Sequence, residues 1–226
     1  SAGVDMTPAS VVLDGRPYQL RGVTPTDASA LVEFGLRGLS DESRALFAPY
    51  DWYSPNLAAE FDASISNALS GQDLHVLACE EGSMETIVAH AFLWSIRDTI
   101  PELGIAVADG HQKRGLGKAL LSLLEQLARD RARWALELTT MQDNLGAYAA
   151  YKRAGYEELG IIRNPLGCDV TAAFRGEVAP TGFASEIHMV RVLDETRRAE
   201  ILASLEAKRM KAEELFERWK TATSAD

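Results

Sequence analysis

The sequence predicts an α/β fold in which a mixed sheet carries helices on its faces. Short apolar segments of strand composition alternate with segments in which apolar residues recur every three or four positions. Along the chain the order is two strands, then helices, then β-β-β-α-β-α-β-β, which is typical of α/β proteins. The chain has 226 residues, 46% of them hydrophobic. This length suits one fairly large domain, or one domain with an appendage.

Turn and cap residues mark the elements in the first third of the chain. Asp14-Gly15 is typical of a two-residue hairpin turn, so residues 11–23 are expected to form two strands. Ser40 is a favourable helix N-cap, and Ser54-Pro55 combines a cap with a proline at the first helical position. The helices predicted here are residues 25–39, 40–47 and 54–71, the last with Leu57, Phe61, Ile65 and Leu69 on its buried face.

Strand-like segments dominate from residue 73 onward and are separated by two helical patterns. Gly155 ends the second of these helices. Residues 164–184 show neither period and are expected to be irregular. The predicted order is strands at 73–81, 86–96 and 102–109, a helix at 114–131, a strand at 134–141, a helix at 144–155, and strands at 156–163 and 186–193.

The last segment, residues 194–222, is strongly helical in propensity, and its apolar residues lie along one stripe that Lys208 interrupts. It is expected to be either a terminal helix packed on the parent domain or a dimerisation arm, because the spacing of the stripe suits a helix pair. We therefore predict one domain over residues 11–193 with this helix appended. The stripe consists of Ile201, Leu205, Ala212, Leu215 and Trp219.

Composition argues against several classes of protein. The net charge of −10 disfavours nucleic acid as a partner, because a phosphate backbone attracts basic proteins. No apolar run approaches the roughly 20 residues that span a bilayer, and no signal-peptide pattern opens the chain. Cys79 and Cys168 cannot form a disulfide framework, and no cluster has metal-ligand spacing. We expect a cytoplasmic protein without a metal and without a membrane or nucleic-acid partner.

Residues 107–124, VADGHQKRGLGKALLSLL, join a strand to a helix through a basic, glycine-rich turn. A P-loop pattern fails here, because Gln112 stands where its first glycine belongs and Ala119 where its serine or threonine belongs. A dinucleotide fingerprint fails because Leu120 replaces its third glycine. The pattern Q/R-x-x-G-x-G/A fits Gln112–Gly117 at every position. An ordinary tight turn is the alternative to a phosphate site.

Charge and backbone chemistry favour the phosphate site. Glycines allow close approach of a ligand, and the N–H groups of a helix N-terminus attract anions. Lys113, Arg114 and Lys118 add positive charge, and residues 111–122 contain no acidic side chain. A second pattern follows in residues 144–156, NLGAYAAYKRAGY. Together the two segments resemble the GNAT superfamily of N-acetyltransferases, which use acyl-CoA.

This resemblance covers residues 16–193 in architecture and 102–156 in motif, and it implies a GNAT fold that takes acetyl-CoA as co-substrate. In the family the pantetheine arm lies between two splayed strands, and here the pairing backbone would be that of Ile105, Ala106 and Val107. Asn144 would bind pantetheine, although a helix N-cap explains it equally well. The residues implied at the pyrophosphate are Gln112, Lys113, Arg114, Gly115, Leu116, Gly117 and Lys118.

The resemblance also implies catalytic roles. Tyr151 matches the general acid that protonates the departing thiolate, since a phenol stays protonated at neutral pH. Glu102 is the candidate general base that accepts a proton from the amine, with a solvated charge at a strand end as the alternative. Tyr148 is expected to pack against the sheet. His111 is expected at the surface, and the other histidines are expected to pack in strands.

Residues 36–47 faintly resemble the start of bacterial protein-lysine-type GNAT domains, and in the family such helices wall the acceptor site. Phe47, Tyr50, Trp52 and Tyr53 could line this wall or form a small separate core, and residues 164–184 are also expected on the acceptor side. In the family, the strand that leads into the glycine-rich turn commonly has a proline near the position of Asp109, and this chain has no proline there. The implied reaction is direct acetyl transfer to a primary amine of a small molecule or protein. A non-catalytic acyl-CoA sensor or assembly module is the alternative.

Overall fold

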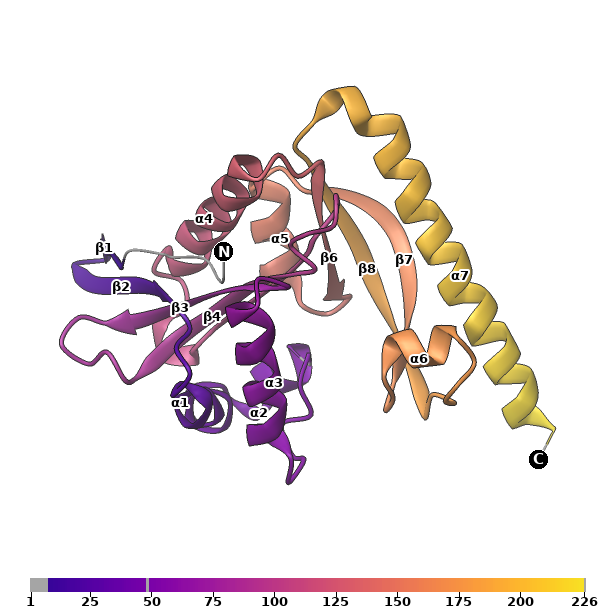
Figure 1. Cartoon of the computed structure of the whole chain (residues 1–226), viewed down its shortest axis with the longest axis horizontal. Helices are drawn as coiled ribbons and strands as arrows, with labels where there is room; N and C mark the ends of the chain where they lie inside the picture. The colour runs from indigo at the N-terminus through magenta and orange to yellow at the C-terminus, as the bar shows by residue number, and fades with distance from the viewer. Residues whose placement is uncertain (1–7, 48, 226) are drawn as a thin grey trace. The chain divides into compact units, whose positions relative to one another are not determined.

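The computed structural model describes residues 8–47 and 49–225, and it has the mixed α/β architecture that the sequence predicts (Figure 1). The chain divides into two compact units, the first ending at Leu136 and the second beginning at Glu137. None of the helices in the described part of the chain has both the length and the apolar character needed to span a bilayer.

Five strands form the sheet of the first unit, and each is antiparallel to the next in chain order. The predicted hairpin turn is confirmed, since Asp14 and Gly15 both have positive φ (52° and 72°). β3 and β4 are buried almost throughout, because α1 to α3 cover one face of this sheet and α4 the other (Figure 1). The strands are β1 (Ala9–Leu13), β2 (Arg16–Gly22), β3 (Leu74–Glu80), β4 (Ile87–Trp94) and β5 (Glu102–Val107).

The helices of the first unit follow the predicted order, with changed boundaries. The helix expected over 25–39 is a short α-helix that continues as a π-helix, and Ser40 caps the next helix as predicted, its Oγ accepting the backbone N–H of Ser43 at 3.1 Å. The helices are α1 (Ala28–Glu33), the π-helix η1 (Phe34–Gly38), α2 (Asp41–Leu46), α3 (Leu57–Leu69), the 3-10 turn η2 (Asp109–His111) and α4 (Leu116–Asp130).

The predicted start of α3 is wrong by about two residues. The carbonyl of Ser54 accepts the N–H of Leu57 at 3.2 Å, so Pro55 occupies the second position of a turn rather than the first turn of a helix. Both settings suit the fixed φ of proline, which is why the sequence does not separate them. Ala68 is buried in place of Leu69, whose side chain is 39% exposed, because 3.6-residue periodicity drifts from strict four-residue spacing.

The second unit contains three adjacent strands in the order β6, β8, β7. The prediction that residues 164–184 are irregular is wrong for much of that stretch. β7 and β8 pair as far as Leu166 with Gly182, and a short helix connects them. Pro165 made a strand look unfavourable from the sequence, but a proline is tolerated in β7 because it is the edge strand of the sheet. The elements are β6 (Ala135–Met141), α5 (Leu145–Arg153), β7 (Glu157–Leu166), α6 (Val170–Phe174), β8 (Gly182–Val192) and α7 (Arg198–Ser224).

The C-terminal helix α7 packs against β7 and β8 of its own unit (Figure 1). Four of the five predicted stripe residues are buried, and Trp219 is half-buried, its indole N–H donating to the carbonyl of Pro180 at 3.0 Å. Lys208 interrupts the stripe because its ammonium pairs with Glu137, a buried carboxylate on β6. The inward face of α7 is thus occupied within the second unit.

Candidate functional site

The turn between β5 and α4 has the backbone conformation of an anion-binding loop. Lys113 and Gly115 have positive φ (62° and 90°), and Gly115 is the N-cap of α4. The first bond within the helix runs from the N–H of Ala119 to the carbonyl of Gly115, at 3.0 Å. The N–H groups of Leu116, Gly117 and Lys118 consequently have no partner inside the helix, and they are available to an anion.

Gly115 and Gly117 differ in the physical reason for having a glycine at that position. The φ of 90° at Gly115 favours glycine whatever surrounds it. At Gly117 neither the backbone nor the packing requires glycine, since an added Cβ would meet only the Val107 side chain, at 4.0 Å. The lack of a side chain at Gly117 leaves space in front of the helix N-terminus. The turn therefore fits a phosphate-bearing ligand that approaches the backbone closely.

Side chains on both sides hold this turn in place. The Gln112 amide donates to the carbonyl of Val107 at 3.0 Å, closing the turn onto the end of β5. His111 was expected at the surface, but it is half-buried between Tyr18 (Nδ1 to hydroxyl, 2.8 Å) and Glu80 (Nε2 to carboxylate, 3.1 Å). Burial lowers the pKa of His111 although the nearby Glu80 raises it. Sequence patterns gave no signal for Tyr18 or Glu80.

The turn itself carries three positively charged side chains. Lys113 and Lys118 are exposed and Arg114 is half-buried, all within a stretch that lacks acidic residues. Cations placed beside free backbone N–H groups raise the attraction for a multiply charged anion. Within the first unit, the chain thus brings every predicted pyrophosphate residue, 112 to 118, onto one strand-turn-helix segment.

β5 leads directly into this turn and carries the predicted pantetheine-binding backbone. Ile105 and Val107 are half-buried and Ala106 is buried. They pair in register with β4, Ile105 with Ala91, Ala106 with His90 and Val107 with Ala89. Glu102 begins the strand opposite Trp94 and is half-buried. The carboxylate of Glu102 is therefore on the same strand as these residues, three positions before the first of them.

The remaining two predicted site residues belong to α5 in the second unit. Asn144 is the N-cap of this helix, its Oδ1 accepting the N–H of Ala147 at 3.4 Å, so the structural use of this residue is confirmed. Tyr151 is buried and packs edge-on against Tyr156, with ring centroids 5.8 Å apart. Burial raises the pKa of Tyr151 to about 12. Tyr148, expected to pack against the sheet, is half-buried and donates its hydroxyl proton to Glu158 of β7 at 2.6 Å.

The aromatic residues after α2 form a small core. Tyr50 and Trp52 are buried, and their rings lie 4.3 Å and 6.0 Å from that of Phe61. The indole of Trp52 also donates to the carbonyl of Phe47 at 2.8 Å. Tyr53 is the exception, being 73% exposed. Of the four residues considered for an acceptor wall, three therefore contribute to the core of the first unit.

Comparison with solved structures supports the fold. The GNAT domain of S. lividans PAT is 23% identical to this chain, with a TM-score of 0.59, covering 82% of this chain and 97% of that one. Ribosomal-protein-alanine N-acetyltransferase from Brucella melitensis is 20% identical, with a TM-score of 0.56, covering 77% of this chain and 99% of that one. Phosphinothricin acetyltransferase from Sinorhizobium meliloti in complex with AcCoA is 19% identical, with a TM-score of 0.57, covering 79% of this chain and 89% of that one. At these identities the likeness shows the fold alone.

A search among curated proteins gives no significant match. The sequence model of the acetyltransferase (GNAT) family, by contrast, matches residues 40–156, which is more than half of the chain. The matched span begins at the N-cap of α2, contains the glycine-rich turn, and ends just after α5. The chain therefore belongs to the acetyltransferase (GNAT) family.

Proposed function

We propose that this GNAT acetyltransferase moves the acetyl group of acetyl-CoA to a primary amine by direct attack of the amine. The turn at residues 112–118 carries the proposal. It combines N–H groups that have no partner inside the helix, space in front of Gly117 and positive side chains. A coenzyme A pyrophosphate has the charge and the size for such a turn.

Each part of the turn has a distinct role in the proposal. The N–H groups of residues 116–118 bind the pyrophosphate, and Lys113, Arg114 and Lys118 contribute charge. Gln112 shapes the turn through its bond to Val107. The backbone of β5 at residues 105–107 pairs with the pantetheine arm, and one N–H polarises the thioester carbonyl. Asn144, whose Oδ1 caps α5, adds a side-chain amide to pantetheine binding.

Tyr151 is the proposed general acid. When bound, acetyl-CoA supplies the thioester, and its thiolate leaves as the amine acquires the acetyl group. The raised pKa of Tyr151 keeps its hydroxyl protonated across the neutral range, so it can donate a proton to that thiolate. A protonated amine cannot attack, and we propose Glu102, directly or through water, as the group that accepts its proton.

The acceptor is proposed as a primary amine of a small molecule or a protein. The similar structures include one enzyme named for a protein alanine and one named for phosphinothricin, so the scaffold accommodates both kinds. We place the acetyltransferase domain at residues 11–193, with 194–222 as an appended helix. The free thiols of Cys79 and Cys168 support a reducing, cytoplasmic setting.

Calorimetric titration of the purified protein with acetyl-CoA tests this proposal, with NAD and ATP as controls. We expect saturable binding of acetyl-CoA alone. Thiol release is then followed with spermidine, phosphinothricin and an alanine-initiated peptide as acceptors. Folded protein that does not bind acetyl-CoA would refute the proposal. If acetyl-CoA binds but its thiol is not released in the presence of any of these amines, the sensor or assembly module is favoured.

A further inference from the structure

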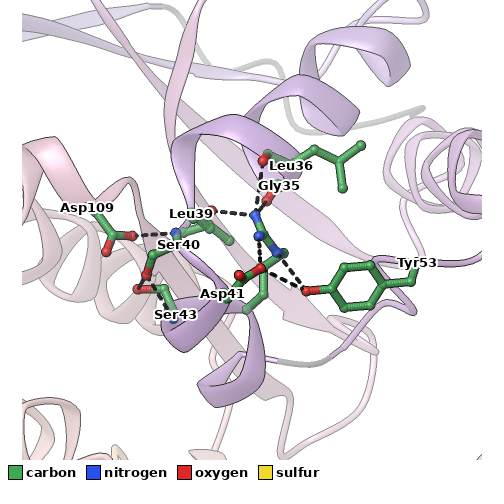
Figure 2. Close-up of polar contacts among 9 residues, drawn as sticks. Gly35, Leu36, Leu39, Ser40, Asp41, Ser43, Tyr53 and Asp109 are labelled. Atoms are coloured by element: carbon green, nitrogen blue, oxygen red, sulfur yellow. Dashed lines mark hydrogen bonds and ion pairs between the residues drawn. The ribbon is translucent and has the colours of Figure 1, made fainter.

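A carboxylate beside the glycine-rich turn is bonded to a distant helix of the same unit. Asp109 Oδ1 accepts the backbone N–H of Ser40 at 3.0 Å, although the two residues are 69 positions apart (Figure 2). Ser40 is the N-cap of α2, and its Oγ lies 3.2 Å from the Oγ of Ser43. The negative charge of Asp109 therefore lies at the N-terminal end of α2, where it is favourable.

The segment that Asp109 holds is internally fixed by Arg44. The Arg44 guanidinium donates to the carbonyls of Gly35 and Leu36, each at 3.0 Å, and to that of Leu39 (Figure 2). These carbonyls lie within or just after the π-helix, whose last turn leaves such groups without helical partners. Arg44 also pairs with Asp41, and its side chain is only 10% exposed.

Tyr53 extends this fixed segment further along the chain. Its hydroxyl accepts from Arg44 Nε at 3.3 Å and donates to Asp41 Oδ1 at 3.1 Å (Figure 2). The π-helix, α2 and Tyr53 are thus held together through one guanidinium. A shift at the N-terminus of α2 is expected to move these parts together.

Asp109 is equally well fixed at its other end. It begins the 3-10 turn η2, two residues after β5 ends and three before Gln112. His111, the last residue of η2, is bonded to Tyr18 and Glu80. Only η2 separates the Asp109 carboxylate from the backbone N–H groups of the glycine-rich turn. A change in the position of the glycine-rich turn therefore reaches α2 through few flexible bonds.

The Asp109 carboxylate is charged at neutral pH, which favours its contact with the N-terminus of α2. Burial opposes the charge of Asp109, but hydrogen bonds from Ser40 and Ser43 hold the pKa of its carboxyl below the usual range. The group is therefore ionised at neutral pH. A proline at this position could not accept either bond, because its side chain carries no acceptor atom.

We propose that Asp109 is a positioning residue that couples the acetyl-CoA turn to α2, so that binding of acetyl-CoA makes local opening of residues 40–47 less frequent. The inference rests on the proposed function, because it takes residues 112–118 as the acetyl-CoA site. Asp109 itself touches neither substrate.

Hydrogen–deuterium exchange of the full chain, with and without saturating acetyl-CoA, tests the coupling. In the unmodified protein we expect acetyl-CoA to slow exchange in residues 40–47 roughly three- to tenfold. Asp109→Ala should abolish that slowing while leaving the Kd for acetyl-CoA within about threefold. Asp109→Asn keeps an oxygen acceptor and should retain the effect in part. Asp62→Ala, which removes an exposed carboxylate on α3, should behave as the unmodified protein.

A second variant guards against misfolding. Ala108 has φ −52° and ψ 139°, a conformation compatible with a following proline, so Asp109→Pro should fold and should also lose the effect. Undiminished slowing of exchange in folded Asp109→Ala or Asp109→Pro would overturn the inference. So would acetyl-CoA that binds the unmodified protein without slowing exchange in residues 40–47. Absence of acetyl-CoA binding would instead refute the proposed function, and the inference with it.

Discussion

His75 and His90 form a buried pair of imidazoles on neighbouring strands. His75 Nδ1 lies 2.8 Å from His90 Nε2, so one ring donates and the other accepts. The outer nitrogens, His75 Nε2 and His90 Nδ1, have no hydrogen-bond partner among the described residues. Burial lowers the pKa of His75 to about 4, and burial together with His75 lowers that of His90 well below its usual value. Both rings are neutral at pH 7.

This pair predicts a loss of stability in acid. In the unfolded chain a histidine takes up a proton near pH 6.5, whereas folded His75 does so only near pH 4. The free energy of unfolding should therefore fall as the pH drops from about 6.5 to about 4, and the pair should contribute no slope above that window. Replacing both residues by phenylalanine should flatten this slope in urea unfolding at several pH values. An unchanged slope would contradict the assignment.

Tyr151 allows a matched test at the residue scale. Tyr151→Phe should lower turnover about a hundredfold or more, because it removes the proposed proton donor, while the Kd for acetyl-CoA stays close to that of the unmodified protein. Tyr148→Phe is the control, since it removes only a bond to Glu158 on the same unit. Equal turnover in the two variants would show that Tyr151 is not the acid. Thiol release and calorimetry measure the two quantities.

At the scale of elements, the strand-turn-helix segment separates binding from stability. Gly117→Ala should leave Tm unchanged, because the new Cβ has no close neighbour, but should weaken acetyl-CoA binding about tenfold by filling the space in front of the helix. Gly115→Ala should weaken binding and also cost about 1 to 2 kcal/mol of stability, because φ is 90° there. Thermal denaturation and calorimetry check both. Unaltered binding by Gly117→Ala would place the phosphate elsewhere.

Sequence patterns predicted elements best where the signals are local and repeated. The hairpin at Asp14-Gly15, the cap at Ser40 and the turn before α4 each depend on a few adjacent residues, and each is confirmed as a structural feature. The pairing of residues 164–166 with 182–184 depends on contacts across a connection, so local periodicity missed it. The contact between Asp109 and Ser40 spans 69 residues and has no sequence signal.

Across the whole chain, ion pairs as well as apolar packing hold elements together. In the second unit, Glu137 of β6 is buried beside His188 of β8 and Lys208 of α7. Burial opposes its charge, but His188 and Lys208 lower the pKa of Glu137 below its usual range. The sequence showed that Lys208 breaks an apolar stripe but could not show its partner, 71 positions away.

Removing Lys208 should destabilise this unit. Lys208→Met leaves the Glu137 carboxylate buried without its ammonium partner, and we expect a loss of about 2 kcal/mol, less than for a fully buried pair because Lys208 is 40% exposed. Lys211→Met, on the exposed face of α7, should have almost no effect. Denaturant unfolding of the two variants gives the comparison. Equal stabilities would mean that the carboxylate is neutralised in another way.

The contact between Arg209 and His188 has a consequence for the imidazole itself. A guanidinium carries only N–H donors, so His188 Nδ1, 3.1 Å from Arg209, must present a lone pair. The ring proton then resides on Nε2, which lies 3.5 Å from the Glu137 carboxylate. One tautomer is selected, and the ring dipole is oriented from α7 towards β6. In nitrogen magnetic resonance, His188 should show one pyridine-like and one pyrrole-like signal, well separated, instead of the averaged pair of a freely exchanging histidine.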